Sequence, residues 1–191
     1  MSSDDTTANA PEPAWVGEVL DFWFREIGAS RWFVKSVELD TLIRERFLAL
    51  YERIVSGELQ GFGTRRAVLA AVIALDQFPR NMFRDSARAF AGDPMARHLA
   101  REAVEQEFDT GLTDEERLFL YLPFEHSEDR EDQAISCELI GSIGNDYWTK
   151  YALAHKEVID RFGRFPHRNS ALGRTSTRAE IELLKDPMGS F

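Results

Sequence analysis

The stretch AVLAAVIAL, residues 67–75, decides how this chain of 191 residues folds. A helix built from it is apolar on every side, and such a helix is covered by other elements on all its faces. Thr64 is a suitable N-cap, whereas Pro79 disfavours the helical conformation of the residue before it. We therefore predict a central helix that begins after Thr64 and ends near Gln77 or Phe78.

Amphipathic helices are predicted on both sides of this central helix, because apolar residues recur there at intervals of three and four. Asp93 followed by Pro94 is typical of a helix start, and Ser127 is expected to cap another helix. Pro123 is expected to break the helix that contains it. The predicted helical segments are 16–27, 39–54, 64–78, 94–104, 113–121, 127–140, 145–162 and 177–184.

No stretch shows the alternating pattern of a β-strand bounded by turn residues. Eight helical segments with short connections predict an all-α fold, an antiparallel helical array that is either a bundle or a solenoid. We expect residues 14–191 to form a single all-helical domain. The polar residues 1–13 contain no apolar run and are expected to form a disordered tail, not a signal peptide.

The composition narrows the classes of function. Hydrophobic residues make up 43% and charged residues 29% of the chain, as in ordinary globular domains. The formal charge of −10 argues against nucleic acid as a partner. The single cysteine, Cys137, excludes an internal disulfide framework, and the longest apolar run is too short to cross a bilayer. We expect a soluble, cytoplasmic protein with no membrane partner, and no particular oligomeric state is indicated.

The first of three polar stretches with candidate functional residues is LDQFPRNMFR, residues 75–84. It places Asp76 at the C-terminal end of a buried helix, where the helix dipole disfavours a carboxylate by about 0.3–1 kcal/mol. A compensating partner is therefore expected, and Arg80 and Arg84 are the nearest. The group is either a structural ion pair around Pro79 or a contact with a ligand.

The second stretch is LPFEHSEDRED, residues 122–132. Glu128 and Asp129 are expected in the first turn of the helix capped by Ser127, where carboxylates favour the positive helix end. That structural role does not explain His126. A histidine three residues before Asp129 suggests an acid–base or metal pair, although this spacing alone is a weak signal.

The third stretch is RFGRFPHRNSALGR, residues 161–174, with the helix before it. His155 shares one helix face with three apolar or aromatic residues and points inward, either as a satisfied core histidine or as part of a site. From Arg161 to Arg178 the chain carries five arginines and no acid. Two anionic counterparts are considered: the acidic stretch 125–132, or an external carboxylate or phosphate held by arginine.

Four motifs in these regions resemble one bacterial family, the domain-of-unknown-function family 924. The motifs are VLDFWF at 19–24, LDQFPRNMFR with ARAF at 75–90, FLYLPFEHSED at 119–129 and HKEVIDRFGRFPHRNSALGR at 155–174. The resemblance implies a tetratricopeptide-repeat-type helical array and no particular activity. It also implies a site, because its motifs are polar at the three stretches described above.

The first functional hypothesis is a site that binds a small anionic molecule and that acts as a catalyst if its histidines exchange protons. His126, His155 and His167 are the candidate acid–base groups, because only histidine has an unperturbed pKa near neutral pH. The spacing of these histidines fits no standard metal motif, so no metal is predicted, and no cofactor-binding motif is present. The candidate ligand-binding residues are Asp76, Gln77, Arg80, Asn81, Glu128, Asp129, Arg164, Arg168 and Asn169.

The alternative is a non-enzymatic helical-repeat module whose concave face binds an acidic peptide or a protein. Exposed aromatic residues would then anchor the partner, and the candidates are Trp32, Phe33, Phe62 and Phe165. A third reading is wholly structural, with the polar stretches pairing only with one another. An open groove with exposed aromatics favours the alternative, whereas converging histidines favour a small-molecule site.

Overall fold

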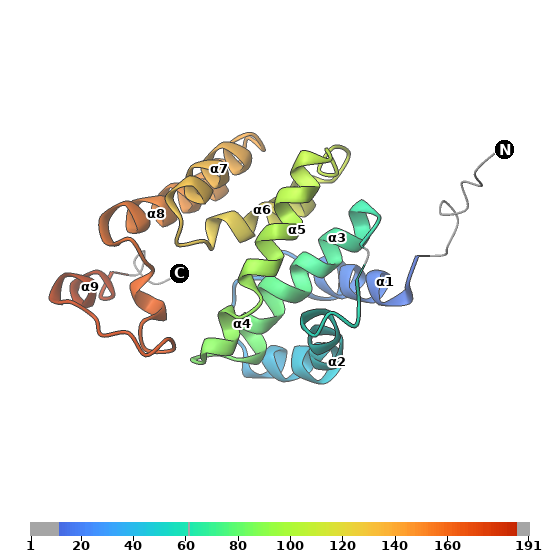
Figure 1. Ribbon diagram of the computed structural model, residues 1–191, viewed down its shortest axis with the longest axis horizontal. Helices are drawn as coiled ribbons and strands as arrows, with labels where there is room; N and C mark the ends of the chain where they lie inside the picture. The colour runs from blue at the N-terminus through green and yellow to red at the C-terminus, as the bar shows by residue number, and fades with distance from the viewer. Residues whose placement is uncertain (1–11, 61, 187–191) are drawn as a thin grey trace.

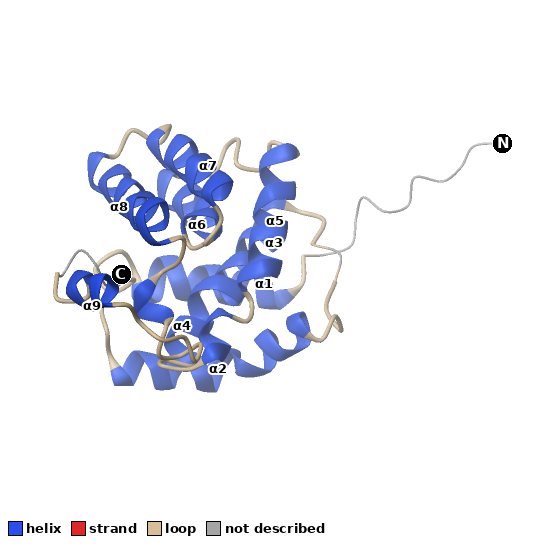
Figure 2. Ribbon diagram, turned by 60° about the vertical axis from the view of Figure 1, so that its left-hand side comes forward, coloured by secondary structure: helices blue, strands red, loops and turns tan. Residues whose placement is uncertain are grey.

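The computed structural model describes residues 12–60 and 62–186. Every regular element in that part of the chain is helical (Figure 2), so the predicted all-α fold is confirmed. The α-helices are α1 (Ala14–Asp21), α2 (Val37–Val55), α3 (Arg65–Val72), α4 (Phe78–Met82), α5 (Asp93–Glu105), α6 (Asp114–Glu125), α7 (Arg130–Gly141), α8 (Asp146–Phe162) and α9 (Arg178–Leu183). Two π segments, η1 (Phe22–Ile27) and η2 (Ile73–Gln77), and two 3-10 segments, η3 (Ala87–Phe90) and η4 (Pro166–Arg168), complete the set. Residues 1–11 of the predicted tail lie outside the described residues.

The apolar stretch 67–75 lies in the central rod, which we define as α3, η2 and α4 in unbroken succession. The predicted stop at Gln77 or Phe78 is wrong, because the rod continues through Pro79 to Met82. Pro79 follows a π turn in which the Phe78 N–H donates to the Ile73 carbonyl, and this wider turn accommodates the proline. With α1 and η1 also joined, the described residues contain eight helical rods, the number predicted.

Three further predictions about helix ends are wrong. Pro123 lies inside α6, because burial of residues 118–125 outweighs the backbone hydrogen bond that proline cannot make. Asp129, not Ser127, caps α7, since its side chain accepts from the backbone of Glu131 and Asp132. Asp93 is the first residue of α5 and makes no capping bond, because its carboxylate faces two arginines.

The central rod is the centre of the hydrophobic core, as predicted. Residues 69–75 are fully buried, and each large apolar side chain among them gains about 1.5–3 kcal/mol from burial. Around the rod, Phe78 stacks on Phe47 with ring centroids 4.6 Å apart, and Trp23 lies edge-on to Phe119 at 5.4 Å. The first contact joins α2 to the rod and the second joins η1 to α6, while α1 and α6 both pack against α3.

Helices α7 and α8 lie beside this core (Figure 1), and α6 joins them to it because its residues 118–122 and 124 belong to the core. Helix α7 packs along α8 and α6 packs along α7. The end of α8 and the segments after it hold a small apolar cluster of Val158, Ile159 and Phe165. No helix in the described part of the chain is long and apolar enough to cross a membrane. The tetratricopeptide-repeat-type arrangement and the single domain stay predictions.

Candidate functional site

Asp76 in η2 is fully buried and lies at the centre of a group of polar side chains. Both of its carboxylate oxygens lie 2.9 Å from His126 Nδ1, and one lies 3.2 Å from Arg80 Nη1. Gln77 Nε2 donates to the other oxygen at 2.6 Å. Burial acts to raise the pKa of Asp76, but Arg80 and the contacts with His126 and Gln77 together outweigh it and hold that pKa well below its usual range. Asp76 is therefore ionised at neutral pH.

Two arginines converge on Asp93 at the start of α5. Arg80 donates to both Asp93 oxygens at 2.9 and 3.1 Å, and Arg168 Nη1 donates to one of them at 3.3 Å. Arg168 Nη2 donates to the His126 carbonyl at 2.9 Å, which caps the C-terminal end of α6. Burial and then Arg80 lower the pKa of Arg168 to about 10, so both arginines remain charged at pH 7.

We define the arginine loop as residues 161–178, which carry five arginines. Arg168 is the most deeply buried of these arginines. Its side chain is only 7% exposed and lies over the rings of Phe90 and Phe165, 4.6 and 4.7 Å from their centroids. Arg168 Nε is buried and has no hydrogen-bond partner among the described residues. A buried donor in this state is normally satisfied by an ordered water or a ligand atom.

Glu125, His126 and His155 form the other side of the group. His155 Nδ1 donates to the Tyr151 carbonyl at 2.9 Å and lies 3.3 Å from Glu125 Oε1. One oxygen or nitrogen atom from each of the three residues lies within 4.8 Å of the other two. The ring centroids of His126 and His155 are 6.2 Å apart.

Burial keeps these three side chains uncharged at neutral pH. Burial and then Asp76 raise the pKa of Glu125 to about 8. Burial and then Arg80 lower the pKa of His126, while burial and then His126 lower the pKa of His155 well below its usual value.

We define the central polar cluster as Asp76, Arg80, Asp93, Glu125, His126, His155, His167 and Arg168. Its charged members are two acids and two arginines, which cancel.

The sequence of the chain matches one family profile over residues 19–188, described as a bacterial protein of unknown function, DUF924. The chain belongs to the DUF924 family. Its fold is similar to that of a solved structure, the protein of unknown function ATU0120 from Agrobacterium tumefaciens. The two chains are 37% identical with a TM-score of 0.86, and the match covers 90% of this chain and 97% of that chain. No curated protein matches.

This family membership confirms the resemblance found from the four motifs. The relative with a solved structure is itself a protein of unknown function, so it supplies no activity to compare. The evidence for the function of this DUF924 protein therefore comes from its own residues.

The structure brings seven of the candidate site residues of this DUF924 protein to one place. Asp76, with Gln77 bonded to it, lies in η2, and Arg80 lies in α4. His126 caps α6, and His155 lies on the inward face of α8 as its spacing predicted. His167 and Arg168 lie in η4, where burial, Arg168 and Arg80 lower the pKa of His167 to about 3.

Three other candidates lie outside the central polar cluster. Asn81 donates to Asp40 at 2.8 Å and lines a separate hollow of about 470 Å³ between α2 and α4. Asp129 caps α7. Arg164 forms an ion pair with Glu180 in α9.

Glu128 and Asn169 both contact Arg174, and this contact shows which anionic group the arginine loop faces. Arg174 donates to both oxygens of Glu128 at 2.7 and 2.9 Å and to Asn169 Oδ1 at 2.9 Å. The backbone N–H of Phe165 also donates to Glu128, at 2.8 Å. The acidic stretch is thus an internal counterpart of the loop, through Glu128.

The sequence reasoning missed two members of the central polar cluster, Asp93 and Glu125. Asp93 was interpreted only as a helix cap, and its two arginine partners become neighbours only in the folded chain. Glu125 carried a recognisable signal, because it is a carboxyl group that directly follows the apolar run 118–124. Buried acids are rare unless they are paired or functional.

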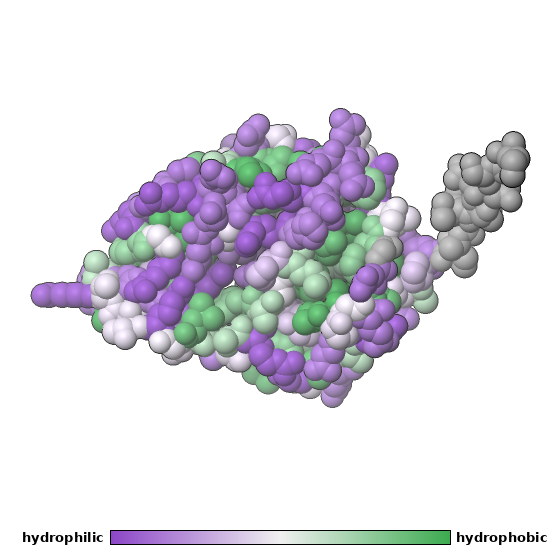
Figure 3. All heavy atoms as spheres, viewed as in Figure 1, coloured by the Kyte–Doolittle hydropathy of each residue, from purple (hydrophilic) through white to green (hydrophobic). Residues whose placement is uncertain are grey.

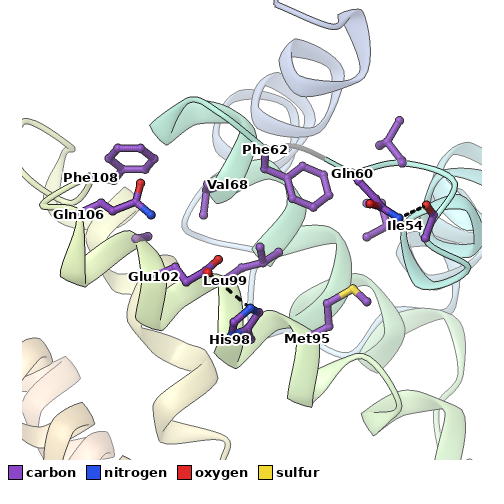
Figure 4. A pocket seen from close by; sticks show the side chains of 13 residues that line it. Ile54, Gln60, Phe62, Val68, Met95, His98, Leu99, Glu102, Gln106 and Phe108 are labelled. Carbon is purple, nitrogen blue, oxygen red and sulfur yellow. Dashed lines mark hydrogen bonds and ion pairs between the residues drawn. The ribbon is translucent and has the colours of Figure 1, made fainter.

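A hollow of about 420 Å³ lies elsewhere on this DUF924 protein, at the ends of α2, α3 and α5. Phe62, Met95 and Leu99 point into it, beside the exposed pair His98 and Glu102 (Figure 4). Figure 3 shows hydrophobic side chains gathered in this part of the face among hydrophilic surroundings.

The hollow bears on the alternative function, because none of the candidate site residues lines it. Of the four predicted aromatic anchors, Phe62 lines the hollow and Phe33 is 61% exposed. Trp32 and Phe165 are buried, so the expectation that these two are exposed anchors is wrong.

Proposed function

We propose that this protein binds a small anionic ligand, a carboxylate or a phosphate, at the central polar cluster. The proposal depends on the environment of Arg168. This residue is a buried arginine that retains an unpartnered Nε within the described residues, at the side of His126. Guanidinium groups bind carboxylate and phosphate oxygens with charge-assisted hydrogen bonds, so an anion is the ligand that such a group selects.

The balance of charges supports an anion of low charge. Asp93 neutralises part of Arg80 and part of Arg168, at 2.9 and 3.3 Å. The depressed pKa of Arg168 reflects burial beside a second arginine, and an anionic oxygen nearby would stabilise both cations. An anion of low charge that places one oxygen at Arg168 is therefore the ligand we expect on this side of the cluster.

The histidines supply the chemistry of the opposite side. Burial lowers the pKa values of His126, His155 and His167, so all three are neutral at pH 7 and able to donate or accept a hydrogen bond. Asp76 bonds His126 Nδ1 and fixes the orientation of that ring. Acid–base catalysis on the bound anion would use this pair.

The apolar hollow favours a second candidate function, the binding of a peptide segment by a non-enzymatic module. The exposed pair of His98 and Glu102 makes its rim polar, while Phe62 and Met95 offer apolar contacts. A peptide bound there would leave the central polar cluster untouched, which separates the two candidates by experiment.

The test is a thermal-shift measurement of the wild type, Arg168→Lys and Arg164→Lys. The probes are inorganic phosphate, phosphorylated metabolites, dicarboxylates and an acidic peptide. A probe at a hundred times its Kd stabilises the fold by about 2.7 kcal/mol. That free energy raises the Tm of a domain of this size by roughly 5–10 °C.

We expect a phosphate or carboxylate probe to raise the Tm of the wild type and of Arg164→Lys, but not that of Arg168→Lys. Arg164 is the matched control, because it lies in the same loop and pairs with Glu180 away from the cluster. A probe that stabilises all three proteins equally, or none, would disprove the proposal. A shift by the acidic peptide alone would favour the second candidate.

A further inference from the structure

Two helices bring three metal-binding side chains together on the histidine side of the central polar cluster. Glu125 ends α6 and His126 follows it as the C-cap, while His155 faces them from α8. One ligand atom from each lies within 4.8 Å of the other two. Two imidazoles with one carboxylate form a donor set that Zn²⁺ and Fe²⁺ take in proteins, with coordination positions left open.

The surroundings of the two histidines match those of metal-binding histidines. A ligating histidine normally donates its other ring N–H to a carboxylate or a backbone carbonyl, which fixes the tautomer. His126 makes this contact through Nδ1 to the ionised Asp76, at 2.9 Å. His155 makes it through Nδ1 to the Tyr151 carbonyl, also at 2.9 Å. With Nδ1 engaged by Asp76, His126 would coordinate a metal through Nε2.

The electrostatics of this side favour a cation. Asp76 is a fully buried carboxylate directly behind His126, and the C-terminal end of α6 carries the negative end of a helix dipole. Glu125 is a buried carboxyl group beside His155, and a bound cation would give its ionised form a partner.

The residue Gln133 of α7 holds this turn in place. Its Nε2 donates to the carbonyls of Glu125 and Ser127 at 2.6 and 2.7 Å, and its side chain is fully buried. The backbone at Glu125 and His126 is thereby fixed against α7. Rigid placement of this kind is what a preorganised metal site requires.

We propose that Glu125, His126 and His155 bind one divalent transition metal ion of the Zn²⁺ or Fe²⁺ class, with an open position that faces the anion site. The metal site is inferred from the positions of Glu125, His126 and His155. The assignment of its open position to the anionic ligand rests on the proposed function.

The test uses full-length protein freed of metal with a chelator and titrated with Zn²⁺, with Co²⁺ as a visible-absorption probe and with Fe²⁺ under anaerobic conditions. The variants are Glu125→Gln and His155→Gln. Glutamine has the same shape as glutamate, so this variant is expected to fold. The matched control is His98→Gln, because His98 is an exposed histidine paired with a carboxylate, Glu102, outside the central polar cluster.

We expect the wild type and His98→Gln to bind one equivalent of metal with the same affinity. Glu125→Gln and His155→Gln should bind at least about tenfold more weakly, since each removes a ligand. Asp76→Asn, which alters the support of His126 and removes no ligand, should weaken binding by about 10–100-fold. Circular dichroism of each metal-free variant checks that it is folded.

Equal metal affinity in the wild type, Glu125→Gln and His155→Gln would overturn the proposal. Titration with inorganic phosphate, with and without Zn²⁺, separates it from the proposed function. Zn²⁺ binding that depends on Glu125, without phosphate binding, supports the metal site and disproves the anion site. Arg168-dependent phosphate binding together with equal Zn²⁺ affinity in all variants does the reverse.

Discussion

Arg164 and Glu180 illustrate how one ion pair makes stability depend on pH. Arg164 donates to both carboxylate oxygens of Glu180, at 2.6 and 2.9 Å. These bonds lower the pKa of Glu180 from 4.5 to about 2. Because the folded-state pKa is depressed, the pair stabilises the fold fully above pH 4.5, and this contribution is lost as the pH falls toward 2.

We expect Glu180→Gln to lower the free energy of unfolding at pH 7, because the charged partner of Arg164 is removed. The difference from the wild type should shrink as the pH falls below 4.5. Urea unfolding at pH 7, 4.5 and 3 measures it. Glu182→Gln is the control, since Glu182 lies in the same helix with its side chain 72% exposed. A difference that is constant across this pH range would contradict the prediction.

At the scale of the elements, Gly92 sets the distance between α5 and the central rod. A Cβ atom at Gly92 would overlap the Leu75 carbonyl oxygen and would lie 3.2 Å from its carbon. The absence of a side chain therefore allows α5 to begin against the rod. This close approach places Asp93, the next residue, beside Arg80 and Arg168.

Gly92→Ala should therefore destabilise the protein by roughly 1–3 kcal/mol, the usual cost of overpacking a buried contact. Chemical denaturation measures the change. Gly141→Ala at the end of α7 is the matched control, because a Cβ there meets nothing within 4 Å. The control should be neutral or stabilising by up to about 1 kcal/mol. Equal effects of the two substitutions would show that Gly92 has no packing role.

The sequence predicts those helix ends that depend on adjacent residues. The Thr64 cap of α3 is confirmed, and α6 and α9 begin close to the predicted starts of segments 113–121 and 177–184, with capping boxes of Thr113 with Glu116 and of Thr177 with Glu180. The errors at Pro79 and Pro123 have a different origin. There the backbone is held helical by a π turn or by burial, and both depend on how the whole molecule packs.

At the scale of the whole molecule, the segments after α8 are joined to the rest largely by polar contacts. Their apolar cluster is small, whereas Arg174 with Glu128 and Arg168 with Asp93 connect them to the acidic stretch and to α5. Segments held by few buried apolar contacts open at lower free energy than the core. The site therefore lies where a stable group of helices meets a more easily opened one.

We expect Glu128→Gln to increase amide hydrogen exchange in residues 163–177, because Arg174 and the Phe165 N–H lose a charged acceptor. Residues 69–75 of the central rod should be unaffected. Exchange followed by mass spectrometry measures both regions. Glu131→Gln is the control, since Glu131 is an exposed acid in the first turn of α7. A uniform increase along the chain would contradict local opening.

The sequence identified the stretches that form the candidate site but not the contacts within it. His126 was a candidate because capping did not explain it, His155 because it faces inward on an apolar stripe, and Arg168 because its stretch carries arginines and no acid. The pairing of Asp76 with His126, fifty positions apart, follows only from the packing of α6 against the rod. Glu125 ends an apolar run in the sequence, and the packing of α8 against α6 places it beside His155 as well as His126.

The π turn at Ile73–Gln77 also has a consequence for comparing related chains. A π turn takes about one residue more than an α turn, so side chains before and after it are out of phase by roughly a quarter of a rotation. A helical wheel drawn straight through residues 65–82 therefore misplaces Arg80 relative to Val68. In a relative that lacks one residue there, the rod would keep its length to within one helical rise while Asp76 and Arg80 turned away from His126 and Asp93.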